Sequence, residues 1–408
     1  MPFHRPILAA LALAGVLAAA CARPGGSSRA ELAARAGMAV RGGGGEVSDT
    51  AGDAGQALPH PAIAALAARL EADVAADSVG SIAAAVVADG RVLWEGAFGV
   101  ADATAGRPAT PETIYRAGSI SKTVTALVLM RLVGRGLVGL DDPVSLYVPE
   151  VERLAGRESG GRPITLRDLA SHTAGVAREP ASSLAARGRM HRWDRKVVAS
   201  IPLTELRSRP GEAYRYSNIG YGILGLALER AAGEPFEALV ATHVLEPLGM
   251  TSSFYEVPRR QRGRLAAGYV NLEDGTVDPR VPRAEHRGRG YKVPNEGLYS
   301  TVGDLARLLL ALVGDSAHAV LDSDARAVML TDQTPGGDRQ TGYGVGLQLT
   351  RLGGTLLAGH SGTVAGYASY LVLDPEARVG VVLLRNYNRG VTNLGSEAHR
   401  VVLELGGS

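Results

Sequence analysis

The chain has 408 residues, of which 46% are hydrophobic and 21% are charged. This is the composition of an ordinary globular protein with a substantial core, and the length fits either two domains or one large hydrolase fold. The formal net charge of +2 gives no electrostatic argument for nucleic-acid binding, so none is expected.

The first residues have the form of an export signal. His4 and Arg5 precede a mostly apolar run, residues 7–20, which is too short to span a bilayer comfortably. Cys21, the only cysteine, follows in Leu-Ala-Ala-Ala-Cys, which resembles a bacterial lipoprotein cleavage site with its leucine one position early. We therefore expect residues 1–21 to be a lipoprotein-type signal peptide, with plain signal cleavage nearby as the alternative. Cys21 would carry a lipid, and the protein would be exported to the bacterial cell envelope, in the periplasm or at the cell surface.

A tether and one folded domain are expected after the signal. Residues 22–57 are rich in Gly, Ala, Ser and Arg, which predicts a flexible tether, and the folded domain is expected over residues 58–408. Apolar residues recur at helical spacing in 61–74, which predicts an amphipathic helix. Two apolar runs, 81–88 and 91–100, then flank Asp89-Gly90, a strong signal for a β-hairpin.

The sequence pattern predicts helices in the middle of the chain and strands near its end. Helices are predicted over residues 120–135, 166–170, 218–232, 234–243 and 303–314, and the arginine-rich stretch 256–292 as a solvated excursion. Strands are predicted over 344–350, 355–358, 367–373 and 379–384, before a closing helix near 391–405. The order predicts an α+β-type fold: an antiparallel sheet of about five strands built from both chain ends, flanked by helices, with an inserted mainly helical region.

Ser119 and Lys122 stand at the start of the predicted helix 120–135. Their spacing places the side chains about 60° apart around a helix axis and roughly 4.5 Å apart along it. A hydroxyl beside an amine suggests a nucleophile with its base, although an N-capping serine beside a chance lysine is the alternative. Lysine occurs only at Lys122, Lys196 and Lys292, whereas arginine is abundant. Because a buried lysine can give up its proton and arginine cannot, this choice favours chemistry at Lys122.

Two later motifs bear on this pair, and the sequence lacks the signatures of several other mechanisms. It has no GxxxxGK loop, no HExxH, no cysteine pair and no Gly-x-Ser-x-Gly elbow, so no metal or cofactor is expected. Tyr216-Ser-Asn218 lies in a loop before an apolar helical run, and Gly359-His-Ser-Gly362 ends an apolar strand. If each motif is taken alone, Asn218 is best interpreted as a helix cap and His360 as a structural histidine.

Taken in this order, the three motifs resemble those of the serine β-lactamase and penicillin-recognising hydrolase family. That family carries a Ser-x-x-Lys, a Tyr-x-Asn and a Lys/His-x-Gly motif. The resemblance is greatest to class C β-lactamases, secreted DD-carboxypeptidases and family VIII esterases, and it spans roughly residues 60 to 405. Supporting stretches lie at residues 136–143, 164–175, 247–250 and 297–300. The resemblance implies a β-lactamase/transpeptidase-like fold.

The resemblance also implies roles for individual residues. Ser119 would attack a carbonyl carbon and become acylated, with Lys122 and Tyr216 as its shared base. Asn218 would hold Lys122 and the substrate amide. The third motif, His360, Ser361 and Gly362, would bind substrate. The oxyanion hole would be formed by the backbone N–H groups of Ser119 and Thr363.

Two departures bear on the substrate. His360 stands where class C β-lactamases have lysine, and histidine is largely neutral at pH 7, so it would hold the carboxylate of a β-lactam less firmly. Glu296 replaces a small residue and would disfavour anionic substrates if it faced the cleft. His172, in a stretch typical of the family, is interpreted as structural.

The sequence therefore favours a serine hydrolase acting on an ester or a D-amino-acid peptide, as an esterase or DD-peptidase with weak β-lactamase action. The alternatives are a genuine class C-like β-lactamase and a penicillin-binding surface receptor that does not turn over. The expected partners are a small ester, peptide or β-lactam substrate and, through the anchor at Cys21, a membrane.

Overall fold

The structure, a computed structural model, describes residues 60–157, 161–272, 276–314, 316–336 and 340–407. The predicted signal peptide, the lipid site at Cys21 and the tether lie outside the described residues. Within the described ranges, no helix combines the length and the apolar character needed to cross a membrane.

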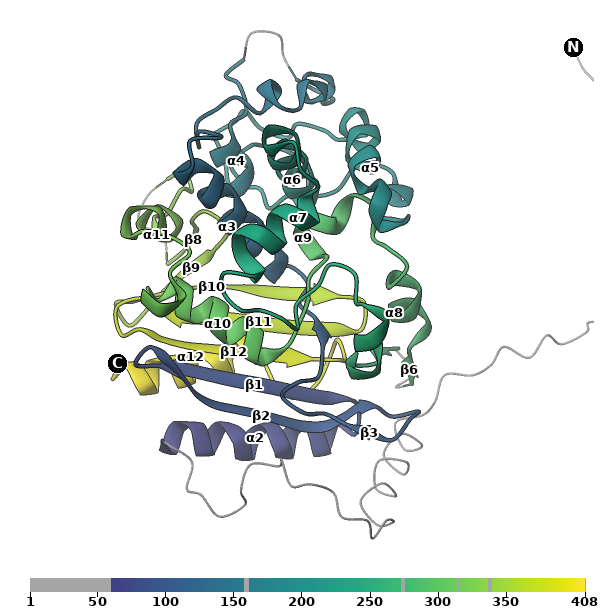
Figure 1. Ribbon diagram of the computed structural model, residues 1–408, viewed down its shortest axis with the longest axis vertical. Coiled ribbons are helices and arrows are strands. Elements are labelled where there is room, and N and C mark those ends of the chain that lie inside the picture. Colours follow the sequence, from purple (N-terminus) through teal and green to yellow (C-terminus); the bar gives the residue numbers. More distant parts are fainter. Residues whose placement is uncertain (1–59, 158–160, 273–275, 315, 337–339, 408) are drawn as a thin grey trace, which may run out of the picture.

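An eight-stranded sheet forms the base of the molecule (Figure 1), in the order β3-β2-β1-β12-β11-β10-β9-β8. Its paired neighbours are all antiparallel. The N-terminal part supplies β1 (Ser81–Ala88), β2 (Arg91–Asp102) and β3 (Arg107–Pro108). The C-terminal part supplies β8 (Thr341–Tyr343), β9 (Gln348–Leu352), β10 (Thr355–Val364), β11 (Tyr367–Asp374) and β12 (Val379–Arg385). The predicted antiparallel sheet from both chain ends is confirmed, and the pairing of β1 with β12 joins the ends.

The strand count of about five was too low. The sheet extends at its edges through β3 and β8, which have two and three residues, too few to show an alternating pattern. The predicted strand 344–350 is also wrong in its first half. The chain turns at residues 344–347, where Gly346 has a φ of +78°, so β8 and β9 form a hairpin there. The Asp89-Gly90 hairpin is confirmed, with positive φ at both residues.

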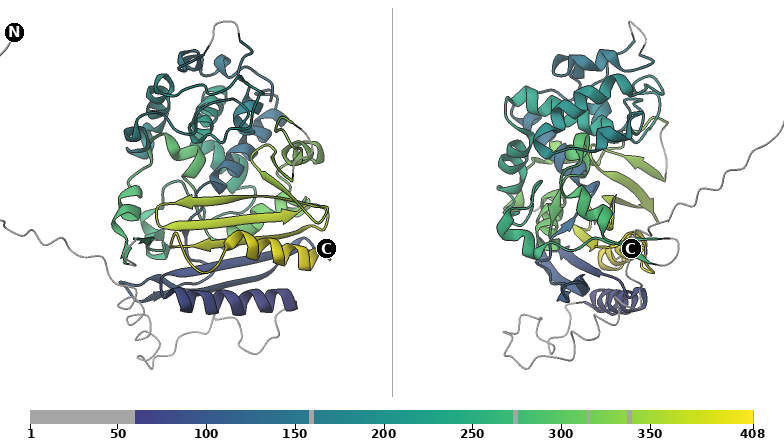
Figure 2. Two further views of the ribbon diagram at one scale, coloured as in Figure 1. Left: turned by 180° about the vertical axis from the view of Figure 1, so that it is seen from behind. Right: turned by 90° about the vertical axis from the view of Figure 1, so that its right-hand side faces the viewer.

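Two hydrophobic cores lie on opposite faces of the sheet. On one face, α2 (Pro61–Asp77) and α12 (Leu394–Gly406) pack against the strands (Figures 1 and 2). On the other face lie α10 (Val302–Leu312) and the helical region. Strand β1 serves both cores because its side chains alternate: Ile82 and Val86 join the first, while Ala83 and Ala85 join the second.

The helical region lies between β3 and β8 in the sequence. Its helices are α3 (Ile120–Gly134), α4 (Leu166–Ala170), α5 (Trp193–Ser200), α6 (Asn218–Ala232), α7 (Phe236–Val240), α8 (Arg280–Glu285), α9 (Val293–Glu296) and α11 (Ser323–Leu330). The 3₁₀ turns are η1 (Val144–Leu146), η2 (Pro149–Arg153), η3 (Ser183–Ala186), η4 (Met190–Arg192), η5 (Ile201–Leu203), η7 (Arg259–Arg264), η8 (Gly290–Lys292) and η9 (Ser316–His318), with a π-helical turn, η6 (Ala241–Leu245). Small ladders join β4 (Tyr115–Arg116) to β7 (Tyr299–Ser300) and β5 (Val270–Asn271) to β6 (Val277–Asp278).

Helix α3 occupies the centre of this region. From Ile120 to Leu132 all of its residues but Arg131 are buried, and its apolar residues surround the axis instead of forming one stripe. A helix that is apolar all round is a core helix. Its N-terminus lies close to β10 and β11 of the sheet, so the residues just before it stand at the junction of sheet and helical region.

Other helix predictions were partly confirmed. Helices α4 and α6 have the predicted bounds. The predicted helix 234–243 is instead divided into α7 and the π-helical turn η6, which directly follows it. The stretch 256–292 is not a solvated excursion throughout, because it includes α8 and Tyr291 is 1% exposed.

Candidate active site

Ser119 directly precedes α3 and is nearly buried. It occupies the N-cap position, but its side chain makes no capping hydrogen bond, so the capping alternative does not describe its hydroxyl. The preceding Gly118 has a φ of +55°, a conformation that glycine adopts without strain. Ser121 secures this turn, because its Oγ donates to the carbonyl of Gly118 at 2.6 Å and accepts from Leu298 N at 3.0 Å.

Lys122 is completely buried in the first turn of α3, with its Nζ 3.1 Å from Ser119 Oγ. The amine also donates to two carbonyl oxygens, Asn218 Oδ1 at 2.8 Å and the backbone oxygen of Asn295 at 3.2 Å. Burial lowers the pKa of Lys122 to about 7, although the carboxylate of Glu296 opposes the shift. Near neutral pH a substantial fraction of this amine is therefore uncharged and able to accept a proton.

Tyr216 lies on the other side of the nucleophile. Its hydroxyl donates to Ser119 Oγ at 3.0 Å, and Lys122 Nζ lies 4.8 Å from the centre of its ring. Burial raises the pKa of Tyr216 well above its usual value of 10, so the phenol keeps its proton at neutral pH. Burial thus distinguishes the two groups: it favours the neutral amine at Lys122 and the protonated phenol at Tyr216.

His172 supports Tyr216 from behind. It is buried with a φ of +61°, and its ring centre lies 4.2 Å from that of Tyr216. Its Nδ1 accepts a hydrogen bond from Ser217 N at 3.1 Å, which ties it to the start of α6. These contacts agree with the structural interpretation of His172.

The third motif lies on β10, and His360 is buried within it, 1% exposed. Its Nδ1 donates to the carbonyl of Ser361 at 2.6 Å, so Nε2 accepts from the hydroxyl of Tyr343 at 2.9 Å. Burial lowers the pKa of His360 to about 3. The imidazole is therefore neutral and has both nitrogens bonded within the protein, so this position presents no cation to a substrate.

Gly362 allows the sheet to approach the nucleophile closely. A Cβ at this position would lie 2.3 Å from the carbonyl oxygen of Ala117 and 3.1 Å from Ser119 N. Ser361 N donates to Gln348 Oε1 at 3.0 Å, toward β9, and the N–H of Thr363, two residues on, points to the same edge. Thr363 N also lies 3.0 Å from where a Cβ of Gly118 would be. The backbone nitrogens of Ser119 and Thr363 thus both lie where residues 118 and 362 approach each other.

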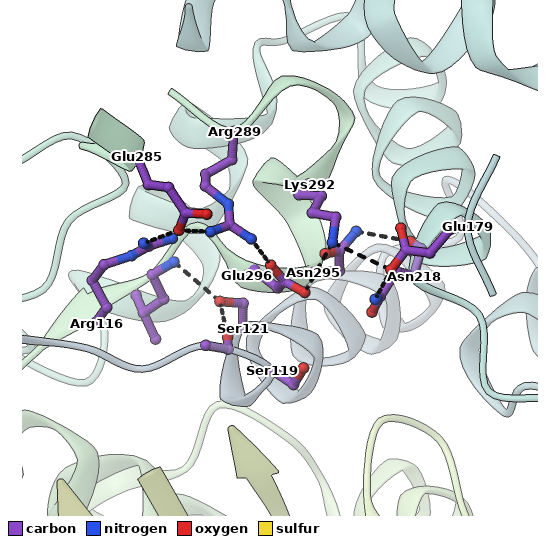
Figure 3. Close-up of polar contacts among 12 residues, drawn as sticks. Arg116, Ser119, Ser121, Glu179, Asn218, Glu285, Arg289, Lys292, Asn295 and Glu296 are labelled. Carbon is purple, nitrogen blue, oxygen red and sulfur yellow. Dashed lines mark hydrogen bonds and ion pairs between the residues drawn. The ribbon is translucent and has the colours of Figure 1, made fainter. Parts of the chain in front are cut away.

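A network of charged groups runs from Asn218 and Glu179 to Arg116 (Figure 3). Asn218 Nδ2 donates to Glu179 Oε1 at 2.6 Å, and Lys292 Nζ lies 3.2 Å from the same oxygen. Lys292 also lies 3.6 Å from Glu296, whose second partner is Arg289. Beyond it, Glu285 joins Arg289 to Arg116.

This network settles the orientation of Glu296. The residue is 5% exposed, and its carboxylate faces Arg289 and Lys292, which lower its pKa against the effect of burial. The charge is balanced within the protein. The predicted penalty for anionic substrates, which assumed that Glu296 faces the cleft, does not follow.

Three contributors to the site were not predicted from the sequence: Glu179, Asn295 and Lys292. A backbone carbonyl such as that of Asn295 leaves no signal in a sequence. Lys292 did leave one, because it is one of only three lysines. Among the described residues, no group of His, Cys, Asp and Glu side chains is arranged to hold a metal ion.

Fold and site together define a serine hydrolase of the β-lactamase and penicillin-binding-protein class. The chain belongs to the beta-lactamase family, whose family model matches residues 66–405. It is similar to esterase EstB of Burkholderia gladioli, with 31% identity over 79% of this chain and 91% of the esterase. It is also 31% identical to a human protein described as beta-lactamase-like 1 and 25% identical to protein flp of Staphylococcus aureus, strain N315.

The matches to the last two proteins cover 76% and 74% of this chain, and only 62% and 59% of their own lengths. Among solved structures, the octameric penicillin-binding protein homologue from Pyrococcus abyssi superimposes with a TM-score of 0.70 at 27% identity. That match covers 85% of this chain and 78% of the other. It confirms the predicted fold class.

Proposed function

We propose that the protein hydrolyses an ester or a D-amino-acid peptide through a covalent acyl-enzyme at Ser119. The observation that carries the proposal is the position of Ser119 Oγ. It lies 3.1 Å from a buried amine and 3.0 Å from a phenol that donates to it. A nucleophile held between an acceptor and a donor of protons is equipped for acyl transfer.

Acylation would begin with neutral Lys122 taking the proton of Ser119 while Oγ bonds to the substrate carbonyl carbon. The electron pair of the carbonyl moves to its oxygen, which the N–H groups of Ser119 and Thr363 stabilise. When the intermediate collapses, the bond to the alcohol or amine breaks. The leaving group takes a proton from Tyr216, which Lys122 replaces.

Deacylation would repeat these steps with water in place of the leaving group. The phenol of Tyr216 would take a proton from water as the water oxygen bonds to the acyl carbon, and would pass its own proton to the neutral amine of Lys122. Ser119 would leave with a proton returned by Lys122. The enzyme ends in its starting protonation state.

An ester is the substrate best supported. The neutral, internally bonded His360 offers no charge to hold a carboxylate, and a neutral ester needs none. Similarity to esterase EstB over 91% of that protein supports the same choice. A genuine class C-like β-lactamase and a penicillin-binding receptor without turnover stay alternatives.

One observation favours a D-amino-acid peptide as a second candidate. The guanidinium of Arg178 lies 4.8 Å from the centre of the Tyr216 ring, and the arginine is exposed. It lines a cleft of about 540 Å³ together with Tyr214 and Tyr216. A cation there would attract the terminal carboxylate of such a peptide.

The test compares labelling and turnover in wild type and Ser119→Ala. A fluorophosphonate probe or a fluorescent penicillin should label the wild type and not the variant. A short-chain p-nitrophenyl ester, nitrocefin and an acyl-D-Ala-D-Ala peptide would then rank the substrates, and the ester should be turned over best. Wild type that neither probe labels would refute the enzyme, and labelling without turnover would favour the receptor. Diffusion-limited turnover of nitrocefin would establish the β-lactamase instead.

A further inference from the structure

The orientation of the Asn218 side chain decides where the lone pair of Lys122 points. A neutral amine has two N–H donors and one lone pair. Two of the three polar neighbours of Nζ are carbonyl oxygens, those of Asn218 and Asn295, which only accept. With both N–H groups directed at them, the lone pair is left for the hydroxyl of Ser119, 3.1 Å away.

This arrangement depends on which end of the Asn218 amide faces Lys122. Oxygen and NH2 of an asparagine amide are nearly equal in size, so only hydrogen bonding separates the two orientations. If the amide were reversed, its NH2 would donate to the lone pair of Lys122 and compete with Ser119 for it. Some group must therefore hold the NH2 end away from Lys122.

Glu179 is placed to do so. Its carboxylate oxygen Oε1 accepts from Asn218 Nδ2 at 2.6 Å, a short charge-assisted bond (Figure 3). An ionised carboxylate can only accept, so it cannot pair with the oxygen end of the amide. Lys292 Nζ lies 3.2 Å from the same Oε1 and balances its charge.

The backbone around Glu179 is fixed to the helix that carries Asn218. The carbonyl of Ala177 accepts from Ser217 Oγ at 2.7 Å, and the carbonyl of Arg178 accepts from Asn218 N at 2.9 Å. Segment 177–179 and the first turn of α6 therefore form one unit. The Glu179 side chain is held at the amide although the segment is a loop.

We propose that Glu179, with Lys292 beside it, is a positioning residue that keeps the Asn218 oxygen toward Lys122 and so aims the lone pair of Lys122 at Ser119. The inference rests on the proposed function, because it assigns Lys122 as the base of a serine hydrolase. Neither residue belongs to the three sequence motifs. Glu179 acts through Asn218 and does not touch the reacting atoms.

A pair of variants at Glu179 separates orientation from charge. Both hydrogen bonds go to Oε1, so Glu179→Gln can keep them through its amide oxygen, whereas Glu179→Ala removes them. With a neutral p-nitrophenyl ester, Glu179→Ala should lower kcat by about tenfold to a hundredfold, the loss expected when a catalytic group is misdirected. Glu179→Gln should keep at least half of the wild-type kcat. Glu205→Gln is the matched control, an exposed acid in an ion pair with Arg207, and should match wild type.

The pH profile gives a readout that a merely structural role would not move. The charged groups that act on Lys122 are Glu296 and Glu179, which raise its pKa, and Lys292 and Arg178, which lower it. The remaining neighbours, Tyr216, Tyr221, His172 and His360, are neutral near pH 7. Removing the Glu179 charge should therefore move the acidic limb of kcat/KM to lower pH, and Lys292→Met should move it to higher pH. Lys196→Met is the control for the second variant.

The outcomes separate this inference from the proposed function. Three results would each overturn the positioning role while the wild type is still labelled at Ser119. The first is wild-type kcat in Glu179→Ala, and the second is a Glu179→Gln variant as slow as Glu179→Ala. The third is that the acidic limbs of kcat/KM in the Glu179 and Lys292 variants do not move apart. A wild type that no probe labels would overturn the proposed function and this inference with it.

Discussion

Lys122 shows how one residue obtains two properties from its surroundings. Its position one turn from Ser119 follows from helix geometry, and its pKa of about 7 follows from complete burial in a helix that is apolar all round. Arginine at the same place would keep its charge, because a guanidinium does not lose its proton in a protein. The site therefore needs this residue type in this environment.

The pH dependence of the reaction should report that environment. Lys122 acts as a base only when neutral, so kcat/KM for a neutral ester should rise with pH up to about 7 and then level off. The measurement is kcat/KM of a p-nitrophenyl ester between pH 5 and 9, corrected for spontaneous hydrolysis. A rate that still rises at pH 9 would assign the limb to Tyr216, and a rate that is already level at pH 5 would assign it to a carboxylate.

A charge-preserving substitution tests the same residue by another route. Lys122→Arg should lower kcat/KM by at least about a hundredfold, because the contribution of a general base is lost while the charge is kept. Lys196→Arg, at a partly exposed position whose amine reaches only the carbonyl of Leu184 at 3.5 Å, should behave as wild type. Equal activity of the two variants would remove Lys122 from the mechanism.

Among the elements, α2 and the segment after β12 are joined on the face of the sheet away from the site. Asp77, the last residue of α2, is buried, and its carboxylate accepts from the hydroxyl of Tyr387 at 2.8 Å and from Val391 N at 2.9 Å. These bonds link the start of the domain to the segment that leads into α12. This contact stabilises the fold without involving the residues of the site.

Tyr387→Phe should therefore weaken the fold without affecting the reaction. It removes one of the donors to a buried carboxylate, which costs about 2 kcal/mol of the free energy of unfolding. Denaturant unfolding measures the loss, and ester turnover at 25 °C should stay within twofold of wild type. Tyr214→Phe, at a residue that is 38% exposed, should change stability by less than about 0.5 kcal/mol. A loss of activity in Tyr387→Phe as large as its loss of stability would contradict this separation.

At the scale of the whole molecule, the site combines two parts of different origin. The helical region supplies Ser119, Lys122, Tyr216 and Asn218, and the sheet supplies Gly362 and Thr363 through β10. The helical region also supplies Arg178 and the rest of the cleft beside Tyr216. Changes in its loops can therefore alter the substrate while the sheet stays the same.

The lipid anchor predicted at Cys21 is open to a direct test. Expressed in a bacterium with its own N-terminus, the wild-type protein should be recovered with the membrane fraction, because a thioether-linked lipid at Cys21 would hold it there. Cys21→Ser should release it. Fractionation followed by immunoblotting measures the distribution, and metabolic labelling with a fatty acid reports the lipid. Recovery of the wild-type protein in the same fraction as Cys21→Ser would argue for plain signal cleavage.

The parts that could be predicted from the sequence depend on local patterns. Helix α6 was found with its bounds because Asn218 to Ala232 is an apolar run that ends at a glycine, although its N-cap is Ser217 and not Asn218. The β1–β2 hairpin was found because Asp89-Gly90 suits a tight turn. Ser119 and Lys122 lie close together because side chains three residues apart are neighbours on the surface of a helix. Distant motifs could be brought together only through the family resemblance.

The rest depends on contacts between loops that no local pattern encodes. The chain of charges from Arg116 to Glu179 joins residues from separate segments, and each pairing is decided by the folded structure. Helix α9 has only four residues and includes a proline, so no periodicity marks it. His360 likewise bonds to Tyr343 on β8, a strand too short to predict.

The complete burial of Lys122 has a consequence for the stability of the protein as a function of pH. An unfolded chain binds a proton at this lysine up to a pKa near 10.5, whereas the folded chain releases it near 7. Folding is therefore opposed by on the order of 4 kcal/mol at pH 7, and this opposition declines as the pH rises toward 10.5. The free energy of unfolding of the wild type, compared with Lys122→Met, should rise by up to about 1.4 kcal/mol per pH unit in that window. Unfolding curves at pH 7, 8 and 9 measure the slope, and equal slopes would contradict it. In mild alkali the opposition from Lys122 therefore declines while the base becomes fully deprotonated, so one titration favours both folding and catalysis.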